Sequence, residues 1–258
     1  MSMRAPRGPC RSRPRSPKVG LARALSKLGY CSRAEAHALI EAKRVRLNGA
    51  VCPDPNARID PDRDLIEVDG RTIASEAKVY LMLNKPRGLV TTASDERGRA
   101  TVYDCLADAR LPRVVPVGRL DKASEGLLLF TNDTRWAAGI LAPESHLDKT
   151  YHVQVDCLAD ASLLRRMMKG AEEEDGDFLQ AKDARLLRRG VRNSWLEVVL
   201  DEGKNRHIRR LLAALGVGVL RLVRVAIGPL QLGQLAKGAY RHLTTEERGA
   251  LAGKKTGK

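Results

Sequence analysis

Aromatic side chains are scarce in this sequence, at 3% of 258 residues. Proteins that bind extended single strands of nucleic acid stack successive bases on exposed aromatic rings. This composition argues against that mode of binding. Any recognition of nucleic acid would therefore depend on phosphate contacts, folded shape and a few base contacts.

Long apolar runs are also missing. The longest uncharged apolar runs, at 126–130 and 211–220, are far shorter than the roughly 20 residues that cross a bilayer. The first 18 residues, MSMRAPRGPCRSRPRSPK, lack the apolar segment of a secretory signal, and their prolines disfavour the amphipathic helix of a transit peptide. We expect residues 1–18 to be a disordered basic tail, and the chain to be cytoplasmic without membrane association.

No cofactor motif is present. The sequence has no C-x-x-C pair, no H-E-x-x-H, no G-x-x-x-x-G-K-[ST], no G-x-S-x-G and no dinucleotide fingerprint after a strand. The cysteines are scattered, which favours a reducing compartment over a disulfide framework. They stand at Cys10, Cys31, Cys52, Cys105 and Cys157. We expect no metal site and no nucleotide cofactor, so an enzyme of this sequence would work with its own side chains.

What the chain does have is positive charge. Lys and Arg number 46 against 31 Asp and Glu, a formal net charge of +15. Such an excess favours association with a polyanion, of which nucleic acid is the commonest. Apolar residues make up 43%, enough for a packed core, and the length suits one medium and one small domain.

The segment 19–70 has the pattern of a small compact domain. Leu21, Leu25 and Leu28 recur at helical spacing. A second helix begins at Ser32, with Glu35 three residues later, which is the capping-box pattern in which each side chain satisfies a backbone donor. The two helices are therefore expected to lie close together in sequence, separated by a short turn.

A β-hairpin follows the two helices. Asn48-Gly49 stands between β-prone residues in 45–51, and 65–68 reads as a further strand. Helix, capped helix and hairpin in this order resemble the S4-like RNA-binding domain. Basic residues surround the helices, and we expect them to bind RNA. Judged by charge alone, a solvent-exposed surface without an RNA partner would have the same composition. These basic residues are Arg23, Lys27, Arg33, Lys43, Arg44 and Arg46.

The remainder of the chain alternates between two patterns. Strand-like runs at 79–84, 126–131, 151–155 and 195–200 are separated by helix-like runs at 161–169 and 205–215. This predicts an α+β domain with a mixed, mainly antiparallel sheet at 79–248. We expect a linker at 71–78 and a basic tail at 249–258.

The densest cluster of reactive side chains lies at 118–133, GRLDKASEGLLLFTND. A polar loop with Arg119, Asp121 and Ser124 leads directly into an apolar strand. Loops on rigid elements commonly carry functional sites. A carboxylate beside basic residues is more often a simple ion pair, so Asp121 considered alone does not establish catalysis.

The same stretch resembles the catalytic motif of the RsuA/RluB/RluE/RluF-type rRNA pseudouridine synthases, in which the aspartate of G-R-L-D is the nucleophile. Five more segments resemble family motifs in the family's order, and the S4-like domain is the usual companion. They are 83–88 (LNKPRG), 95–102 (DERGRATV), 149–153 (KTYHV), 202–211 (EGKNRHIRRL) and 222–230 (LVRVAIGPL). His207 departs from the family, which usually has Gln there.

The resemblance implies a cofactor-free isomerisation of uridine. Asp121 would act at C1′, either by covalent addition or by assisting elimination through a glycal. Arg209 would keep that carboxylate charged, with Arg206 as the alternative. Tyr151 would pack against the target base and help to remove the C5 proton.

Four further residues are expected to bind the substrate: Arg119, Lys204, Arg206 and Leu222. Arg119 would fill the space left by the flipped base or, alternatively, contact a phosphate. Leu222 would pack on the uracil edge or, alternatively, occupy an ordinary core position. The expected partner is ribosomal RNA, bound by a monomer. The motifs are shared by synthases of both subunits, and of the two we favour the large subunit.

Two other functions remain open from the residues alone. A non-catalytic ribosome-binding or assembly factor would use the S4-like domain and basic tails equally well, but would not need Asp121, Tyr151 and Arg209 in these contexts. A metal-dependent nuclease would need clustered carboxylates. The only dense acidic run, at 172–175, reads as a solvated loop.

Overall fold

The computed structural model describes residues 18–61, 63–73, 77–93, 95–173 and 176–252. The chain divides into two compact units, Met1–Glu76 and Ala77–Lys258. The basic tail expected at 1–18 lies almost wholly outside the described residues, as does 253–258 of the second tail. Within the described ranges, none of the helices is long and apolar enough to cross a membrane.

The first unit packs two helices against a small sheet. Helix α1 (Leu21–Lys27) and helix α2 (Arg33–Glu41) contact each other, and Ser32 and Glu35 form the expected capping box. Strands β3 (Ala50–Val51), β2 (Val45–Leu47), β5 (Ile66–Val68) and β6 (Arg71–Thr72) form an antiparallel sheet in that order. Strand β1 (Val19–Gly20) pairs with β4 (Arg58–Ile59).

The predicted linker at 71–78 starts too early, because β6 continues the sheet of the first unit. Asp69 and Gly70 both have positive φ, 51° and 74°, as in the tight turns that join twisted strands. Asp69-Gly70 is itself a hairpin signal, whereas the polar residues after it have the composition of a linker. Part of the second predicted tail is likewise structured, because helix α6 (Thr245–Leu251) extends past residue 248.

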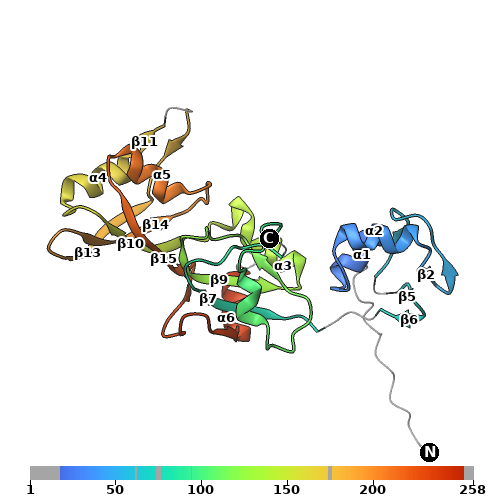
Figure 1. Cartoon of the computed structure of the whole chain (residues 1–258). Coiled ribbons are helices and arrows are strands. Elements are labelled where there is room, and N and C mark those ends of the chain that lie inside the picture. Colours follow the sequence, from blue (N-terminus) through green and yellow to red (C-terminus); the bar gives the residue numbers. More distant parts are fainter. Residues whose placement is uncertain (1–17, 62, 74–76, 94, 174–175, 253–258) are drawn as a thin grey trace, which may run out of the picture. The chain divides into compact units, whose positions relative to one another are not determined.

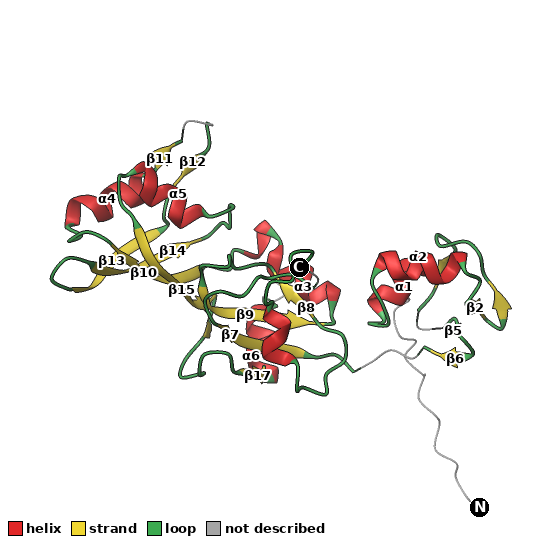
Figure 2. Ribbon diagram, viewed as in Figure 1, coloured by secondary structure: helices red, strands yellow, loops and turns green. Residues whose placement is uncertain are grey.

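The second unit is built on a nine-stranded sheet. Figure 2 shows its strands in yellow. Its main path runs β13 (Asp183–Arg189), β14 (Ser194–Leu200), β10 (Lys149–Val155), β15 (Val219–Ile227), β9 (Glu125–Thr131), β7 (Tyr80–Lys85) and β17 (Tyr240–His242). Strands β8 (Val115–Val117) and β16 (Leu230–Gln231) pair with β9 and β15. Only β15 and β9 pair in parallel among the described strands, so the mainly antiparallel α+β prediction is confirmed.

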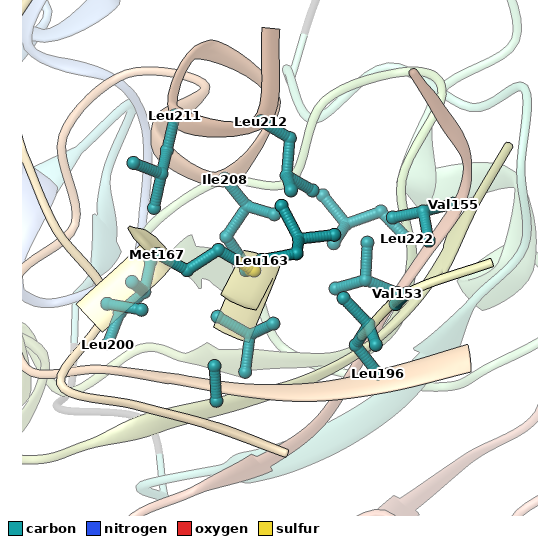
Figure 3. Packing of buried hydrophobic residues seen from close by; sticks show 14 of the residues in the cluster. Val153, Val155, Leu163, Met167, Leu196, Leu200, Ile208, Leu211, Leu212 and Leu222 are labelled. Carbon is teal, nitrogen blue, oxygen red and sulfur yellow. The ribbon is translucent and has the colours of Figure 1, made fainter. Parts of the chain in front are cut away.

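Helices α4 (Ala161–Lys169) and α5 (His207–Ala214) lie on one face of the β13–β14–β10–β15 part (Figure 1). Their apolar side chains form one core with the inward residues of the strands (Figure 3). That core includes Val153, Leu163, Met167, Leu196, Ile208, Leu211 and Leu222. Strand β14 alternates buried and half-buried residues along its length, as a strand with one covered face should. This packing fixes β10, β15 and the start of α5 relative to one another.

Smaller elements complete the second unit. Helix α3 (Thr134–Leu141) follows β9, with the Asp133 side chain accepting from its first amides. The short pair β11 (Ala171–Glu172) and β12 (Phe178–Leu179) lies next to α5, and two 3₁₀ turns occupy Val102–Leu106 and Pro143–Ser145.

Candidate functional site

The loop that carries Asp121 joins β8 to β9 and is held in place by a buried lysine. Lys85, at the end of β7, is fully buried. Its Nζ donates to the backbone oxygens of Asp121 at 3.1 Å and Ser124 at 2.8 Å, and to that of Pro86 at 3.2 Å. Burial lowers the pKa of Lys85 to about 8, against the opposing effect of the Asp121 and Glu125 carboxylates. The loop conformation is thus tied to the sheet through one cation.

A pair of hydrogen bonds also fixes the residue before Asp121. The Thr91 hydroxyl donates to the carbonyl of Leu120 at 2.7 Å, and the Leu120 amide donates back to that hydroxyl at 3.3 Å. The Leu120 side chain is buried in the core beneath the loop. With Leu120 and its own carbonyl fixed, Asp121 presents its side chain from a rigid support, as a catalytic group would require.

The strand after the loop comes unusually close to its parallel neighbour. A Cβ placed on Gly126 would lie 2.2 Å from the carbonyl oxygen of Arg224 on β15, and Gly126 has φ +99°. Only glycine tolerates both the contact and the conformation. Gly126 therefore lets the Asp121 loop approach β15.

A cavity of about 390 Å³ opens beside this loop. Asp121, Tyr151 and Leu222 all line it, so three residues that are far apart in sequence meet at one site. Tyr151 is half-buried on β10, where its Cα partner on β15 is Arg224, and Leu222 is buried. The Asp121 side chain is 35% exposed, which leaves its carboxylate reachable from the cavity.

The arginine within ion-pair distance of Asp121 is Arg206, with Nη1 3.7 Å from Oδ2. This differs from the expected Arg209 pair. Arg209 is half-buried and donates instead to the carbonyls of Ala123 at 3.3 Å and Val219 at 3.2 Å. Burial is the main cause that lowers the pKa of Arg209; Arg206 lowers it further, and Asp121 opposes the shift.

The reason for the difference lies at the start of α5. Arg206 is the residue before the helix and has a left-handed φ of 49°. This conformation turns the chain sharply, and the Arg206 side chain comes to line the cavity. Sequence spacing does not reveal such a turn, because a non-glycine residue rarely adopts it.

The other expected substrate residues occupy the same cavity. Arg119 and Lys204 line it and are exposed, and Arg119 also borders a second hollow with Asp95, Arg97 and Arg99. The Lys204 ammonium donates to the carbonyl of Phe178 at 2.8 Å. All four predicted substrate residues therefore lie around one opening.

Two residues of the 202–211 segment have structural partners. His207 is buried, with Nε2 3.0 Å from the Gln180 carbonyl, and burial lowers its pKa. Arg210 forms ion pairs with Glu173 and Asp177. The acidic run at 172–175 is therefore not simply a solvated loop, because Glu173 neutralises this arginine.

The basic residues of the first unit are mostly on its surface. Arg23, Arg33, Lys43 and Arg46 are exposed, and Lys27 is half-buried. Arg44 differs from its neighbours. It makes a bidentate pair with Asp69, at 2.8 and 2.5 Å, which offsets its charge.

No group of three or more His, Cys, Asp or Glu side chains suited to a metal ion occurs within the described residues. The cavity beside Asp121 instead gathers cations around one carboxylate and one aromatic ring. This composition suits an anionic, planar substrate.

Comparison with known proteins agrees with this geometry. Residues 79–214 match the family model for RNA pseudouridylate synthases, and residues 19–65 match the S4 domain. The chain belongs to the RNA pseudouridine synthase family. The matched domain includes Asp121, Tyr151 and Arg209.

Relatives of the synthase align along most of its length. An uncharacterized RNA pseudouridine synthase of Aquifex aeolicus is 39% identical over 236 residues, 91% of this chain and 94% of that protein. The ribosomal large subunit pseudouridine synthase B of Bacillus subtilis is 35% identical, covering 88% of this chain and 93% of its own. A solved pseudouridylate synthase superposes with a TM-score of 0.63 at 28% identity, covering 90% and 99%.

Three residues that line or support the synthase site were given no role from the sequence. Lys85 supports the loop, and Lys149 and Arg224 line the cavity. All three fall inside the matched segments 83–88, 149–153 and 222–230. The signal was present in the motifs, but burial of a charged side chain is a tertiary property that spacing does not reveal.

Proposed function

We propose that this synthase isomerises one specific uridine of ribosomal RNA, with Asp121 as the nucleophile and without a cofactor. The observation that carries the proposal is that the Asp121 carboxylate lines the same cavity as Tyr151 and lies 3.7 Å from Arg206. A carboxylate, a flat ring and a guanidinium around one opening match what the reaction needs.

The reaction breaks the N1–C1′ bond, turns the uracil and joins C5 to C1′. Asp121 acts at the sugar, either by bonding to C1′ or by taking the C2′ proton so that a glycal forms. The C5 proton is lost at the end, and an N1 proton is gained. The isomerisation is redox-neutral overall, because the formal changes at C1′ and C5 cancel, so the chemistry itself calls for neither a redox cofactor nor a metal.

The arginines keep the nucleophile charged. A carboxylate withdrawn from water tends to take up a proton, and a nearby cation opposes this. Arg206 lies within ion-pair distance of Asp121 and acts directly, whereas Arg209 donates to the Ala123 carbonyl of the same loop and acts from there.

Tyr151 and Arg119 suit a base that has left its stack. Enzymes that act on a base turn it out of the helix into a pocket, where it packs against apolar and aromatic side chains. Tyr151 and Leu222 provide those surfaces, and Tyr151 helps to remove the C5 proton. Arg119, at the rim, fills the space that the base has left or contacts a phosphate.

Ribosomal RNA is the substrate that the relatives and the charge support best. The Bacillus subtilis relative is named for the large ribosomal subunit, and we favour that subunit here. The net charge of +15 and the S4 unit suit a folded RNA partner. We place the enzyme in the cytoplasm, acting as a monomer.

Mapping pseudouridines in total rRNA, with and without the gene for this chain, tests the proposal. One uridine or a small cluster should lose its modification in the deletion strain. The purified chain should restore that modification on the matching rRNA fragment in the presence of EDTA and without nucleotide. Identical maps in the two strains, together with binding but no conversion of rRNA, would instead indicate a ribosome-binding factor.

A further inference from the structure

Two cations that the proposed mechanism does not use line the cavity beside Tyr151. Lys149 precedes Tyr151 by two residues on β10. Arg224 on β15 is the Cα partner of Tyr151. The strands are neighbours in the sheet, and Arg224 lies close enough to Lys149 to lower the pKa of that lysine, an effect second only to burial. Two like charges thus meet at the position where the base is expected to lie.

Arg224 is not fully satisfied by the protein. It is 6% exposed, and its Nε donates to the carbonyl of Leu127 at 2.8 Å. Its Nη2 is buried and has no hydrogen-bond acceptor among the residues that the structure describes. A buried guanidinium nitrogen without a partner costs stability, and so does its repulsion from Lys149. An incoming negative group would offset both costs.

The position of the pair indicates which negative group this is. The exposed cations Arg119, Lys204 and Arg206 stand around the same cavity and are available to phosphates. Arg224, by contrast, is buried, and its Cα partner on β10 is Tyr151. A base reaches such a place more readily than a backbone phosphate does.

We propose that Arg224 and Lys149 stabilise the uracil anion released from the ribose. This inference rests on the proposed function. When the N1–C1′ bond breaks, its electron pair stays on N1 and spreads to O2 and O4, while Asp121 bonds to C1′ or takes the C2′ proton. Arg224 and Lys149 donate hydrogen bonds to this charge and keep their own protons. When C5 bonds to C1′, the charge is consumed and the contact weakens.

Preorganised donors aimed at developing charge are a large source of catalysis, and loss of one typically costs about 10²–10³ in rate. We expect Arg224→Gln to lower the single-turnover rate about 100-fold and Lys149→Met about 10-fold. Arg224→Lys should recover part of the loss. The Kd for RNA should change by less than about threefold, because the rim cations remain.

A better leaving group distinguishes this role from a structural one. The probe is an rRNA fragment that the wild-type enzyme converts, made with uridine or with 5-fluorouridine at the target. Fluorine withdraws electrons and stabilises the anion by itself, so the loss caused by Arg224→Gln should shrink to about 10-fold or less with 5-fluorouridine. Because fluorine blocks loss of the C5 substituent, the readout is transfer of C1′ from N1 to C5, measured by mass spectrometry of the digested RNA.

The controls separate the possible failures. Arg188→Gln removes a cation from the same sheet that stacks on Trp195, away from the cavity lining, and should leave both rates unchanged. If Arg224→Gln does not fold, Lys149→Met and Arg224→Lys carry the test. Equal losses with both RNAs, or weak RNA binding with a normal rate, would overturn the inference in favour of a structural or phosphate-binding role. Failure of the wild type to convert any rRNA would instead refute the proposed function.

Discussion

The ammonium of Lys85 donates a hydrogen bond to the backbone carbonyl of Asp121, at 3.1 Å. The proposed nucleophile is thus held through its own main chain by a lysine on a different strand. Because the same ammonium also binds the carbonyl of Ser124, it spans the turn of the loop. Placement of the carboxylate therefore depends on a residue that does not line the cavity.

Replacement of Lys85 by Met should loosen this turn. The apolar side chain fills the same space but leaves the carbonyls of Asp121 and Ser124 without their buried donor, which costs roughly 1–3 kcal/mol of unfolding free energy. The single-turnover rate should fall at least tenfold, because small displacements of a reacting group are costly. Urea unfolding and rate measurements check both effects. Lys122→Met, on the exposed side of the same loop, is the matched control, and equal behaviour of the two variants would contradict the role of Lys85.

Gly126→Ala should be strongly destabilising. The new Cβ would meet the Arg224 carbonyl at 2.2 Å, and φ +99° is strained for alanine. Either β9 and β15 separate or the variant fails to fold, with a loss of more than about 2 kcal/mol. Gly139→Ala in α3 is the control, because nothing lies within 4 Å of its new Cβ and alanine favours a helix. Thermal melting should show a large fall for the first variant and a small rise for the second; similar melting would refute the close approach.

The buried Glu125 carboxylate should make stability depend on pH. Its hydrogen bond with Arg221 is the main cause that lowers the pKa of Glu125 to about 2, helped by Lys237. A carboxylate whose pKa is lower in the folded than in the unfolded protein stabilises the fold at pH values above the unfolded pKa. This contribution is lost as the pH falls toward the folded pKa. Glu125→Gln should cost about 2 kcal/mol at pH 7 after allowance for the exposed cations.

The difference between wild type and Glu125→Gln should be constant from pH 7 to 5 and shrink below about pH 4.3. Urea unfolding at pH 7, 5, 4 and 3 measures it. Glu144→Gln, at an exposed position, should show no such dependence. A difference that stays the same at pH 3 and pH 7 would mean that the ion pair does not hold Glu125 charged.

The exposed cations of the S4 unit should set the salt dependence of RNA binding. Replacing Arg23, Arg33 and Lys43 by Ala removes up to three phosphate contacts, each worth about 0.7–0.9 in the slope of log K against log salt. The matched control replaces three other exposed arginines of the unit, Arg58, Arg63 and Arg71. Titrations between 50 and 300 mM salt should show a reduced slope for the first triple alone. The same slope for both triple variants would show that RNA binding depends on the total charge of the unit and not on a defined binding surface.

Much of the fold followed from local patterns. The capping box at Ser32 and Glu35, the Asn48-Gly49 hairpin and the extent of α4 are each encoded within a few residues, and the structure confirms them. The β6 strand was missed because a two-residue edge strand of exposed polar side chains has no hydrophobic pattern. Its Asp69-Gly70 turn was the only local signal.

The site was less predictable than the fold. The motifs indicated that Asp121 and Tyr151 share a site, and both line one cavity. They did not indicate which arginine lies within ion-pair distance of Asp121. That depends on the left-handed backbone of Arg206 and on the acceptors that hold Arg209. Burial of Lys85 and Arg224 was equally hidden, because a charged residue reads as exposed unless its partners are known.

The most direct test of the account is the single-turnover conversion of the target rRNA fragment by Asp121→Asn. The amide is the same size as the carboxylate but is a poor nucleophile and a poor base. We predict no detectable pseudouridine, with a Kd for RNA within about threefold of the wild type. Conversion at the wild-type rate would contradict the assignment of Asp121 and, with it, the proposed mechanism.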